Sequence, residues 1–158
     1  ALPLHREMFS MRRRMLPEED PKVVAALLDL AATCGELGRH DEAAAFFEEA
    51  RSIRLRSLPA DHVEIASAAY NLAVAQAQLR KFNEASETFR QALAIRRRAL
   101  PAGHPDILAA AQGAISCLET LGRAPEASQV MEELSRDAKA GRPSDAGSTA
   151  AAGSTAEA

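Results

Sequence analysis

Tryptophan is absent from this sequence, tyrosine occurs once, and aromatic residues make up only 4% of the 158 residues. The apolar residues, 47% of the chain, are therefore mostly Ala, Leu, Val and Ile. This composition favours closely packed helices over a β-sheet. Charged residues make up 26%, which is usual for a folded domain, and the length suits one domain.

Strong charge and long apolar runs are also missing. The net charge is −3, so neither nucleic acid nor an anionic membrane is attracted electrostatically. The longest uninterrupted apolar run, Val23 to Leu28, is far too short to span a bilayer. The first residues show no secretion signal. We therefore expect a cytoplasmic protein with no nucleic-acid and no membrane partner.

Residues that carry chemistry are equally sparse. The two cysteines, Cys34 and Cys117, stand in apolar helical patterns, which predicts two buried, reduced thiols. A disulfide, a metal pair or a nucleophile is the alternative, but the sequence displays no partner groups for any of these. It contains no Gly-rich phosphate loop, no metal-spaced cluster and no nucleophile elbow. We expect no catalytic residue, no metal and no cofactor, and hence no enzyme.

What the chain does have is an internal repeat of 42 residues. A Leu-Pro pair stands at 58–59, at 100–101 and at 16–17, and His62 recurs as His104. Self-similarity at a period between 20 and 50 residues is typical of stacked units. The sequence therefore predicts an array of repeated supersecondary units.

Each repeat predicts two helices. In the first full repeat the apolar residues recur at three- and four-residue steps, as one helix face requires; they are Val23, Leu27, Leu30, Ala31 and Cys34. Gly38 is placed to end this helix in the left-handed conformation, and Asp41 to cap the next one. In the later repeats Arg80 replaces the glycine, Asn83 is the predicted cap, and Pro125 fits a first helical turn.

These observations define the expected organisation. A repeat domain covers 1–139, with a partial repeat at 1–16 and repeats at about 17–58, 59–100 and 101–139. Residues 140–158 are rich in Gly, Ala, Ser and Thr and are expected to form a flexible, disordered tail. Residues 1–16 match the second helix of a unit, so we expect a fragment of a longer array. An apolar flank on this helix would allow self-association.

Small residues recur at fixed places in both helices, where they allow the backbones to approach closely; they are Ala31, Ala73, Ala43, Ala85 and Ala127. Leu72-Ala73, the segment 81–85, Phe89 and Ala92-Leu93 resemble a tetratricopeptide repeat. The 42-residue spacing and the Leu-Pro-x-x-His-Pro linker at 100–105 resemble the kinesin-light-chain type. The resemblance implies an all-α, right-handed superhelical solenoid of antiparallel helix pairs, whose first helices line a concave groove for a peptide or helix of a partner.

The groove positions follow from the resemblance and from the four-residue spacing of one helix face. They are Leu28, Asp29, Ala32, Glu36, Tyr70, Asn71, Val74, Gln78, Gln112, Ser116 and Thr120. Asn71 matches an asparagine that such repeats use to hold a ligand backbone; alternatively, it ties one helix to its neighbour. Tyr70 is either an aromatic anchor for the partner or part of the packing between units.

The charge of the groove residues restricts the class of ligand that we expect. The groove row contains no Lys or Arg, whereas Asp29, Glu36 and Glu119 lie on or near it. The resemblance would imply two ways of binding an acidic ligand: clamping the C-terminal carboxylates of a chaperone, or gripping an acidic, tryptophan-bearing peptide. Both need basic residues in the groove, so their absence weakens both interpretations and predicts a neutral or mildly basic peptide. Arginine groups at 12–14, 51–56 and 96–98 form either a ladder for an acidic partner or a solvated face that complements helix ends.

The sequence thus predicts a protein–protein interaction scaffold, part of a larger adaptor or multidomain protein. A structural, self-associating segment of a repeat array is one alternative. A regulatory arm of an enzyme encoded elsewhere in the parent chain is another.

Overall fold

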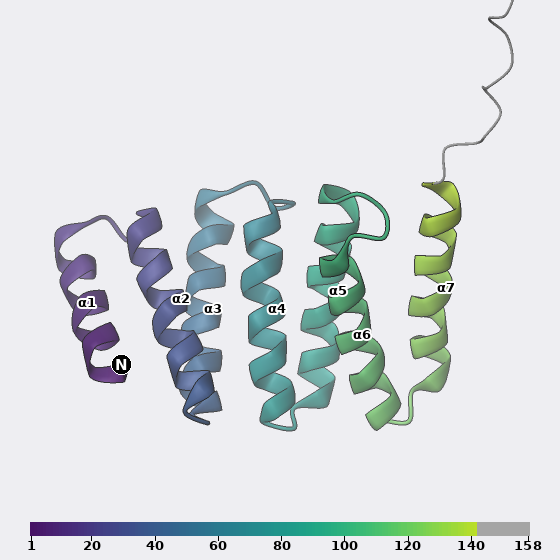
Figure 1. Ribbon diagram of the computed structural model, residues 1–158, viewed down its shortest axis with the longest axis horizontal. Helices are drawn as coiled ribbons and strands as arrows, with labels where there is room; N and C mark the ends of the chain where they lie inside the picture. The colour runs from purple at the N-terminus through teal and green to yellow at the C-terminus, as the bar shows by residue number, and fades with distance from the viewer. Residues whose placement is uncertain (142–158) are drawn as a thin grey trace, which may run out of the picture.

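In the computed structural model, which describes residues 1–141, the chain is a row of seven helices without a strand (Figure 1). Consecutive helices pack on one another along the row. The helices are α1 (Leu2–Met15), α2 (Pro21–Glu36), α3 (His40–Ser57), α4 (Val63–Gln78), α5 (Phe82–Ala99), α6 (Pro105–Thr120) and α7 (Ala124–Ala140). The predicted all-α, right-handed solenoid of antiparallel helix pairs is confirmed. The predicted flexible tail falls, from residue 142 onward, outside the described residues.

Three units follow from the 42-residue period. Unit 1 is α2 with α3, unit 2 is α4 with α5, and unit 3 is α6 with α7. In each unit the first helix packs on its own second helix and on the second helix of the preceding unit. Helix α1 takes the place of a second helix and packs on α2.

The first helices begin at side-chain caps that repeat with the period. Asp20 Oδ1 accepts a hydrogen bond from the backbone N–H of Lys22 at 2.8 Å. His62 Nδ1 accepts from Glu64 N–H at 3.2 Å, and His104 Nδ1 from Asp106 N–H at 3.1 Å. Each bond satisfies one of the free amides of a helix start. The linker histidines His62 and His104 are therefore helix caps.

The second helices begin differently from the prediction. Asp41 and Asn83 do not cap them: the N-cap residues are Arg39 and Lys81, two residues earlier, and neither makes a side-chain cap bond. The preceding turn explains the difference. The amide of Arg39 donates to Cys34 O at 2.9 Å across a left-handed residue, so the chain enters the next helix without a free capping position. Asp41 lies in the first turn, where its charge suits the helix dipole.

Arg80 has a left-handed backbone, with φ of 60°, where the equivalent glycines Gly38 and Gly122 have φ of 73° and 71°. A side chain in this conformation costs about 1 kcal/mol. We expect Arg80→Gly to raise the free energy of unfolding by about 0.5–1 kcal/mol, measured by urea unfolding. Lys81→Gly is the matched control because Lys81 has φ of −82°, and there glycine should destabilise. A loss of stability in both variants would contradict the expectation.

The recurring small residues lie at the helix contacts. Ala31, Ala43, Ala73 and Ala85 are fully buried, and Ala127 is 1% exposed. Phe47 and Phe89 add bulk one turn further along the second helices and are both buried. The core therefore lies between neighbouring helices and is built from alanine and larger apolar side chains in equal numbers.

Candidate functional site: a cleft between the first helices

A cleft of about 340 Å³ lies between α2 and α4, with residues of α3 completing its wall. We call it the groove cleft. Its lining residues are Ala32, Gly35, Glu36, His40, Ala43, Phe47, Asn71, Val74, Ala75 and Gln78. Buried Ala43, Phe47 and Ala75 supply an apolar base, and polar side chains stand around it. Such a combination suits an apolar side chain of a ligand whose backbone is held at the edge.

The structure brings five of the eleven predicted groove residues to this cleft: Ala32, Glu36, Asn71, Val74 and Gln78. All five are exposed. The side chains of Asn71 and Gln78 form no hydrogen bond within residues 1–141, so both amides are free to donate and accept. In particular, no hydrogen bond from Asn71 to a neighbouring helix supports the alternative role.

The other predicted positions lie elsewhere. Asp29 is exposed on α2, and Leu28 is half-buried against the cores of unit 1. Gln112, Ser116 and Thr120 are exposed along α6 and do not line the groove cleft.

Tyr70 is half-buried in the packing between units 2 and 3. Its ring meets Phe89 edge to face, with ring centroids 5.5 Å apart. The guanidinium of Arg96 lies over the same ring, 4.7 Å from its centroid. These contacts match the packing alternative for Tyr70 rather than an anchor that waits for a partner.

The groove cleft is acidic. Glu36 is the one carboxylate among its lining residues, none of which is Lys or Arg, and exposed Asp29 lies two turns away on the same helix. A cation brought to this cleft would therefore meet favourable charge, screened beyond about 8 Å at physiological salt.

The arginines that recur with the period mostly bridge neighbouring helices. Arg12 and Arg96 each donate to the backbone carbonyl ten residues further on, that of Lys22 and of Asp106. Arg54 pairs with the Glu64 carboxylate, also ten residues on, at 2.6 Å. These contacts join each second helix to the next first helix. They were not predicted from the sequence. The recurrence of arginine at 12, 54 and 96 was the available signal.

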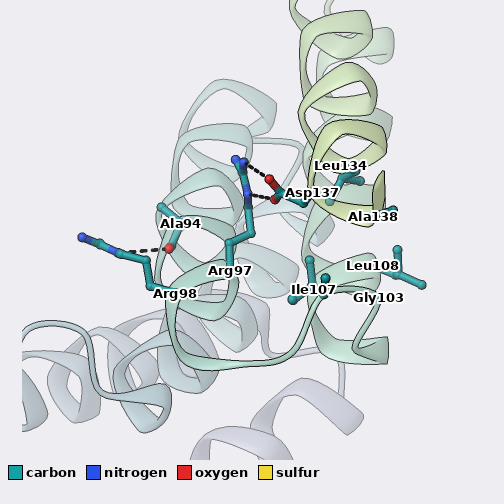
Figure 2. A pocket seen from close by; sticks show the side chains of 10 residues that line it. Ala94, Arg97, Arg98, Gly103, Ile107, Leu108, Leu134, Asp137 and Ala138 are labelled. Atoms are coloured by element: carbon teal, nitrogen blue, oxygen red, sulfur yellow. Dashed lines mark hydrogen bonds and ion pairs between the residues drawn. The ribbon is translucent and has the colours of Figure 1, made fainter. Parts of the chain in front are cut away.

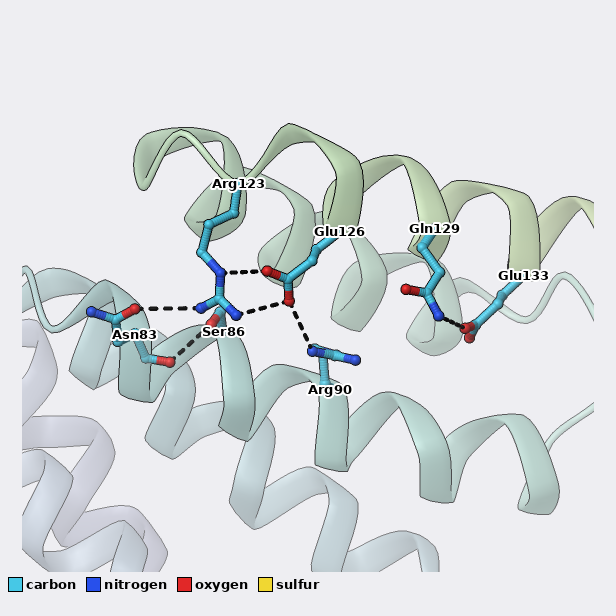
Figure 3. Close-up of polar contacts among 7 residues, drawn as sticks. All are labelled: Asn83, Ser86, Arg90, Arg123, Glu126, Gln129 and Glu133. Atoms are coloured by element: carbon cyan, nitrogen blue, oxygen red, sulfur yellow. Dashed lines mark hydrogen bonds and ion pairs between the residues drawn. The ribbon is translucent and has the colours of Figure 1, made fainter.

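A second set of arginines joins consecutive second helices. Figure 3 shows Arg123 and Arg90 converging on Glu126, with Arg123 Nε at 2.6 Å and Arg90 Nη1 at 3.5 Å from its oxygens. Arg123 also reaches the side-chain oxygen of Asn83 on α5 at 3.4 Å. The hydrogen bond from Arg123 lowers the pKa of the Glu126 carboxyl. Acids of the chain itself thus pair with both of these arginines.

The groove cleft lies between units 1 and 2, and the second helices of these units, α3 and α5, lack such ion pairs within residues 1–141. Arg6–Glu42 joins α1 to α3, and Arg90–Glu126 joins α5 to α7, both with partners 36 residues apart. At the α3–α5 junction the equivalent positions are Glu48 and Glu84. No ion pair joins these two helices in the described part of the chain; Arg51 only donates to the Gln91 side chain, at 2.9 Å.

Residues 1–141 contain neither a metal-binding cluster nor an activated cysteine. No group of three or more His, Cys, Asp or Glu side chains there could hold a metal ion. Cys34 and Cys117 are free and buried, and burial raises the pKa of both thiols, which disfavours the nucleophilic thiolate. No helix among these residues is both long and apolar enough to cross a bilayer.

Comparisons with known proteins agree with this geometry. The sequence model of the tetratricopeptide repeat family matches residues 22–98. No curated protein sequence matches the chain. Several solved structures do, among them nearly identical TPR-like repeats assigned to a kinesin light chain of Podosopora anserina, which superpose with a TM-score of 0.80 at 23% identity over 90% of this chain and 68% of that one.

Two further structures extend the likeness. A form of the same Podosopora anserina repeats with a single substitution has a TM-score of 0.80 at 25% identity, covering 89% of this chain and 67% of that one. BtubC (BKLC) from P. vanneervenii has a TM-score of 0.75 at 19% identity, covering 98% of this chain and 63% of that one. The chain thus spans about two thirds of the length of these relatives.

Proposed function

Because this chain is a tetratricopeptide repeat array of the kinesin-light-chain type, we propose that its repeat domain, residues 1–139, is a protein-interaction scaffold that holds a peptide or helix of a partner in the concave groove. Repeats of this fold generally bind other proteins, and the function here is binding rather than catalysis. The observation that carries the proposal is the groove cleft, with its apolar base and free amides. A cytoplasmic location stays a prediction.

The cleft suggests how a peptide is held. An apolar side chain enters against Phe47 and Ala75, while Asn71 and Gln78 hydrogen-bond the peptide backbone. Asn71 and Gln78 are seven residues apart on α4, so they stand two turns apart on one face and can hold successive parts of an extended segment.

The acidic edge selects the ligand. We expect a short peptide with one leucine and flanking lysines to bind more tightly than a peptide of equal length with flanking glutamates. Glu36→Lys should weaken the lysine peptide about three- to tenfold, since a charge at the edge of a site has a modest effect on affinity. Isothermal titration at low salt measures both affinities.

Glu132→Lys is the matched control. Glu132 is exposed on α7, so this substitution makes the same change in net charge at a place away from the cleft. Its affinity for the lysine peptide should stay near that of the wild type. A clear preference of the wild type for the glutamate peptide would contradict the proposed ligand class. Unchanged binding in an Asn71→Ala, Val74→Ser variant would move the site away from the groove.

Self-association is the second candidate function. Helix α1 has an exposed apolar flank, on which Leu4, Met11 and Met15 are 58%, 52% and 75% exposed. Glu7 and Arg14 flank it, and neither side chain forms an ion pair within residues 1–141. An antiparallel pair of α1 helices would bury the apolar flank and bring Glu7 of each copy towards Arg14 of the other.

Mass in solution distinguishes the two functions. If α1 mediates pairing, sedimentation velocity should show a concentration-dependent dimer, and Met11→Glu should return the chain to a monomer with unchanged helicity. Ser10→Glu, on a neighbouring exposed position of α1, is the control with the same added charge. A monomer at every concentration would exclude pairing through this flank and leave the groove as the proposed site.

A further inference from the structure

A second cleft, of about 420 Å³, opens between α6 and α7 at the end where α5 and α7 finish (Figure 2). We call it the α6–α7 cleft. Its walls include Ile107, Leu108 and Leu134, and Arg97, Arg98 and Asp137 stand at its edge. It shares no lining residue with the groove cleft, which belongs to units 1 and 2.

Comparison of the three units shows that this cleft is a departure from the repeat. Leu108 is 50% exposed, whereas the equivalent Val24 and Ala66, 84 and 42 residues earlier, are 3% and 0% exposed. In units 1 and 2 the second helix covers this position with an isoleucine: Ile53 packs with Val24, and Ile95 packs with Ala66. Unit 3 leaves a large aliphatic side chain open to solvent instead.

The missing cover is explained by one residue. Asp137 occupies the position of Ile53 and Ile95. Its carboxylate turns to Arg97 on α5, with Oδ2 2.6 Å from Nε and Oδ1 3.1 Å from Nη2. The hydrogen bond from Arg97 lowers the pKa of this carboxyl, so it is ionised at neutral pH and unsuited to cover an aliphatic wall.

Two arginines stand at the edge of the cleft, and only one of them is paired with acids. Arg97 is matched by two acids, Asp137 and Glu133, the latter at 2.6 Å. Arg98 forms no ion pair within residues 1–141, and its one hydrogen bond there goes from Nε to Ala94 O in its own helix, at 3.3 Å. Arg98 thus lines the cleft with an exposed guanidinium that no acid holds, and Figure 2 shows its side chain directed away from Leu108 and Leu134.

We propose that the α6–α7 cleft is a second binding site, distinct from the groove, for a partner segment that carries a large aliphatic side chain followed by a carboxylate. The aliphatic side chain packs on Leu108 and Leu134 in the place that an isoleucine fills in the other units. The carboxylate pairs with Arg98, whose exposed side chain gives up its bond to Ala94 O and turns towards the cleft on binding, and whose planar guanidinium can hold both oxygens. The site prefers acidic peptides, which is opposite to the preference of the groove cleft.

The test uses the whole chain with labelled methyl groups and three short, blocked, alanine-based peptides. Each peptide carries one leucine, followed by glutamate, glutamine or lysine. We expect the glutamate peptide to shift the methyl resonances of Ile107, Leu108 and Leu134, with affinity falling about three- to tenfold from glutamate to glutamine and again to lysine. Shifts confined to Val74 and its surroundings would assign the peptide to the groove and overturn the proposal.

Two variants of Asp137 separate cleft filling from loss of the ion pair. Asp137→Ile restores the residue found at the equivalent positions of units 1 and 2, and it should close the cleft and abolish the methyl shifts. Asp137→Asn breaks the ion pair without filling the cleft, so it should retain binding. Wild-type affinity in the isoleucine variant, with its fold verified by thermal melting, would overturn the proposal.

Arg98→Gln tests the charge contact by itself. It should reduce the affinity of the glutamate peptide to that of the glutamine peptide and leave the glutamine peptide unchanged. Equal losses for both peptides would contradict the carboxylate contact. Nuclear Overhauser contacts between Leu108 and residues 142–158 in the free wild type would name the chain's own end as the occupant, and would likewise overturn a partner site. None of these outcomes bears on the lysine-peptide titration of the groove.

Discussion

Replacing Gly113 by alanine is expected to destabilise the array by about 1–2 kcal/mol, although alanine is the better helix former by about 1 kcal/mol. A Cβ at this position would lie 2.6 Å from two carbons of the Phe89 ring and 2.8 Å from a third. Phe89 is only 4% exposed, so its ring has little room to move. Overpacking of this kind costs about 1–3 kcal/mol and outweighs the gain in helix propensity. Gly113→Leu should cost more, about 3 kcal/mol.

Gly35→Ala is the matched control for this prediction. It is the same exchange inside a first helix, but its Cβ would meet only Ala43, at 4.0 Å. The equivalent residue of unit 2 is already alanine, Ala77. Urea unfolding should therefore show a gain of up to about 1 kcal/mol for Gly35→Ala beside the loss for Gly113→Ala.

A double-mutant cycle identifies the cause. Phe89→Leu creates space over Gly113, so the cost of Gly113→Ala should fall in that background, with a coupling energy of about 1 kcal/mol. Additive effects would mean that the Phe89 ring does not limit this position. Equal stability gains for both alanine variants would also contradict the close packing of α6 on α5.

The sequence was sufficient to predict the helices and their stacking in repeated units because both are periodic. Apolar residues at three- and four-residue steps identify a buried face, and a 42-residue recurrence identifies stacked units. Gly38 could be interpreted for a different reason, since a turn residue acts on its immediate neighbours in the chain. The two wrong caps, Asp41 and Asn83, reflect a turn that is two residues shorter than expected.

Contacts between units were harder to predict. Arg97 and Arg98 are adjacent in a run that is typical of a solvated basic helix end, yet one is paired across to α7 and the other is not. The partner of Arg97 lies 40 residues away, on a helix whose direction only the fold determines. The effect of Asp137 was likewise hard to predict. Its alignment with Ile53 and Ile95 can be read from the sequence, but the opening beside Leu108 can be seen only in the structure.

The groove could be predicted as a face but not as a shape. Four-residue spacing places Val74 and Gln78 on one face of α4, with Asn71 beside it, and the cleft is found there. Spacing does not reveal that Tyr70, one residue before Asn71, packs against α5 and α6 and does not line the cleft. That depends on Phe89 and Arg96 from the following helix.

Arg96→Ala is expected to cost about 2–4 kcal/mol of unfolding free energy. Arg96 is 5% exposed, donates from Nη1 to Asp106 O at 2.8 Å, and lies over the Tyr70 ring. Truncation removes a charged hydrogen bond, worth about 1.5–3 kcal/mol, and a desolvated cation–π contact of about 2 kcal/mol, with some overlap between them. It also leaves a void at the junction of units 2 and 3.

Arg96→Met should cost less than Arg96→Ala, about 1–2 kcal/mol. Burial lowers the pKa of Arg96, which means that the charge itself is held at a cost. Its Nε is buried without a hydrogen-bond partner, which adds to that cost. Methionine keeps the apolar stem while removing the charge. Arg98→Ala, on an exposed neighbour, is the control and should change stability by less than about 0.5 kcal/mol.

Equal losses in the methionine and alanine variants would show that the guanidinium contacts, not the stem, hold the junction. Either result bears on how groove binding is tested. The Tyr70 ring contacts both Arg96 and Phe89. A Tyr70→Ala variant therefore loosens the packing of units 2 and 3 whether or not a peptide touches the ring. Loss of a partner in that variant would report this packing. Asn71 and Val74 are exposed on the groove cleft, so their variants report contact with the peptide itself.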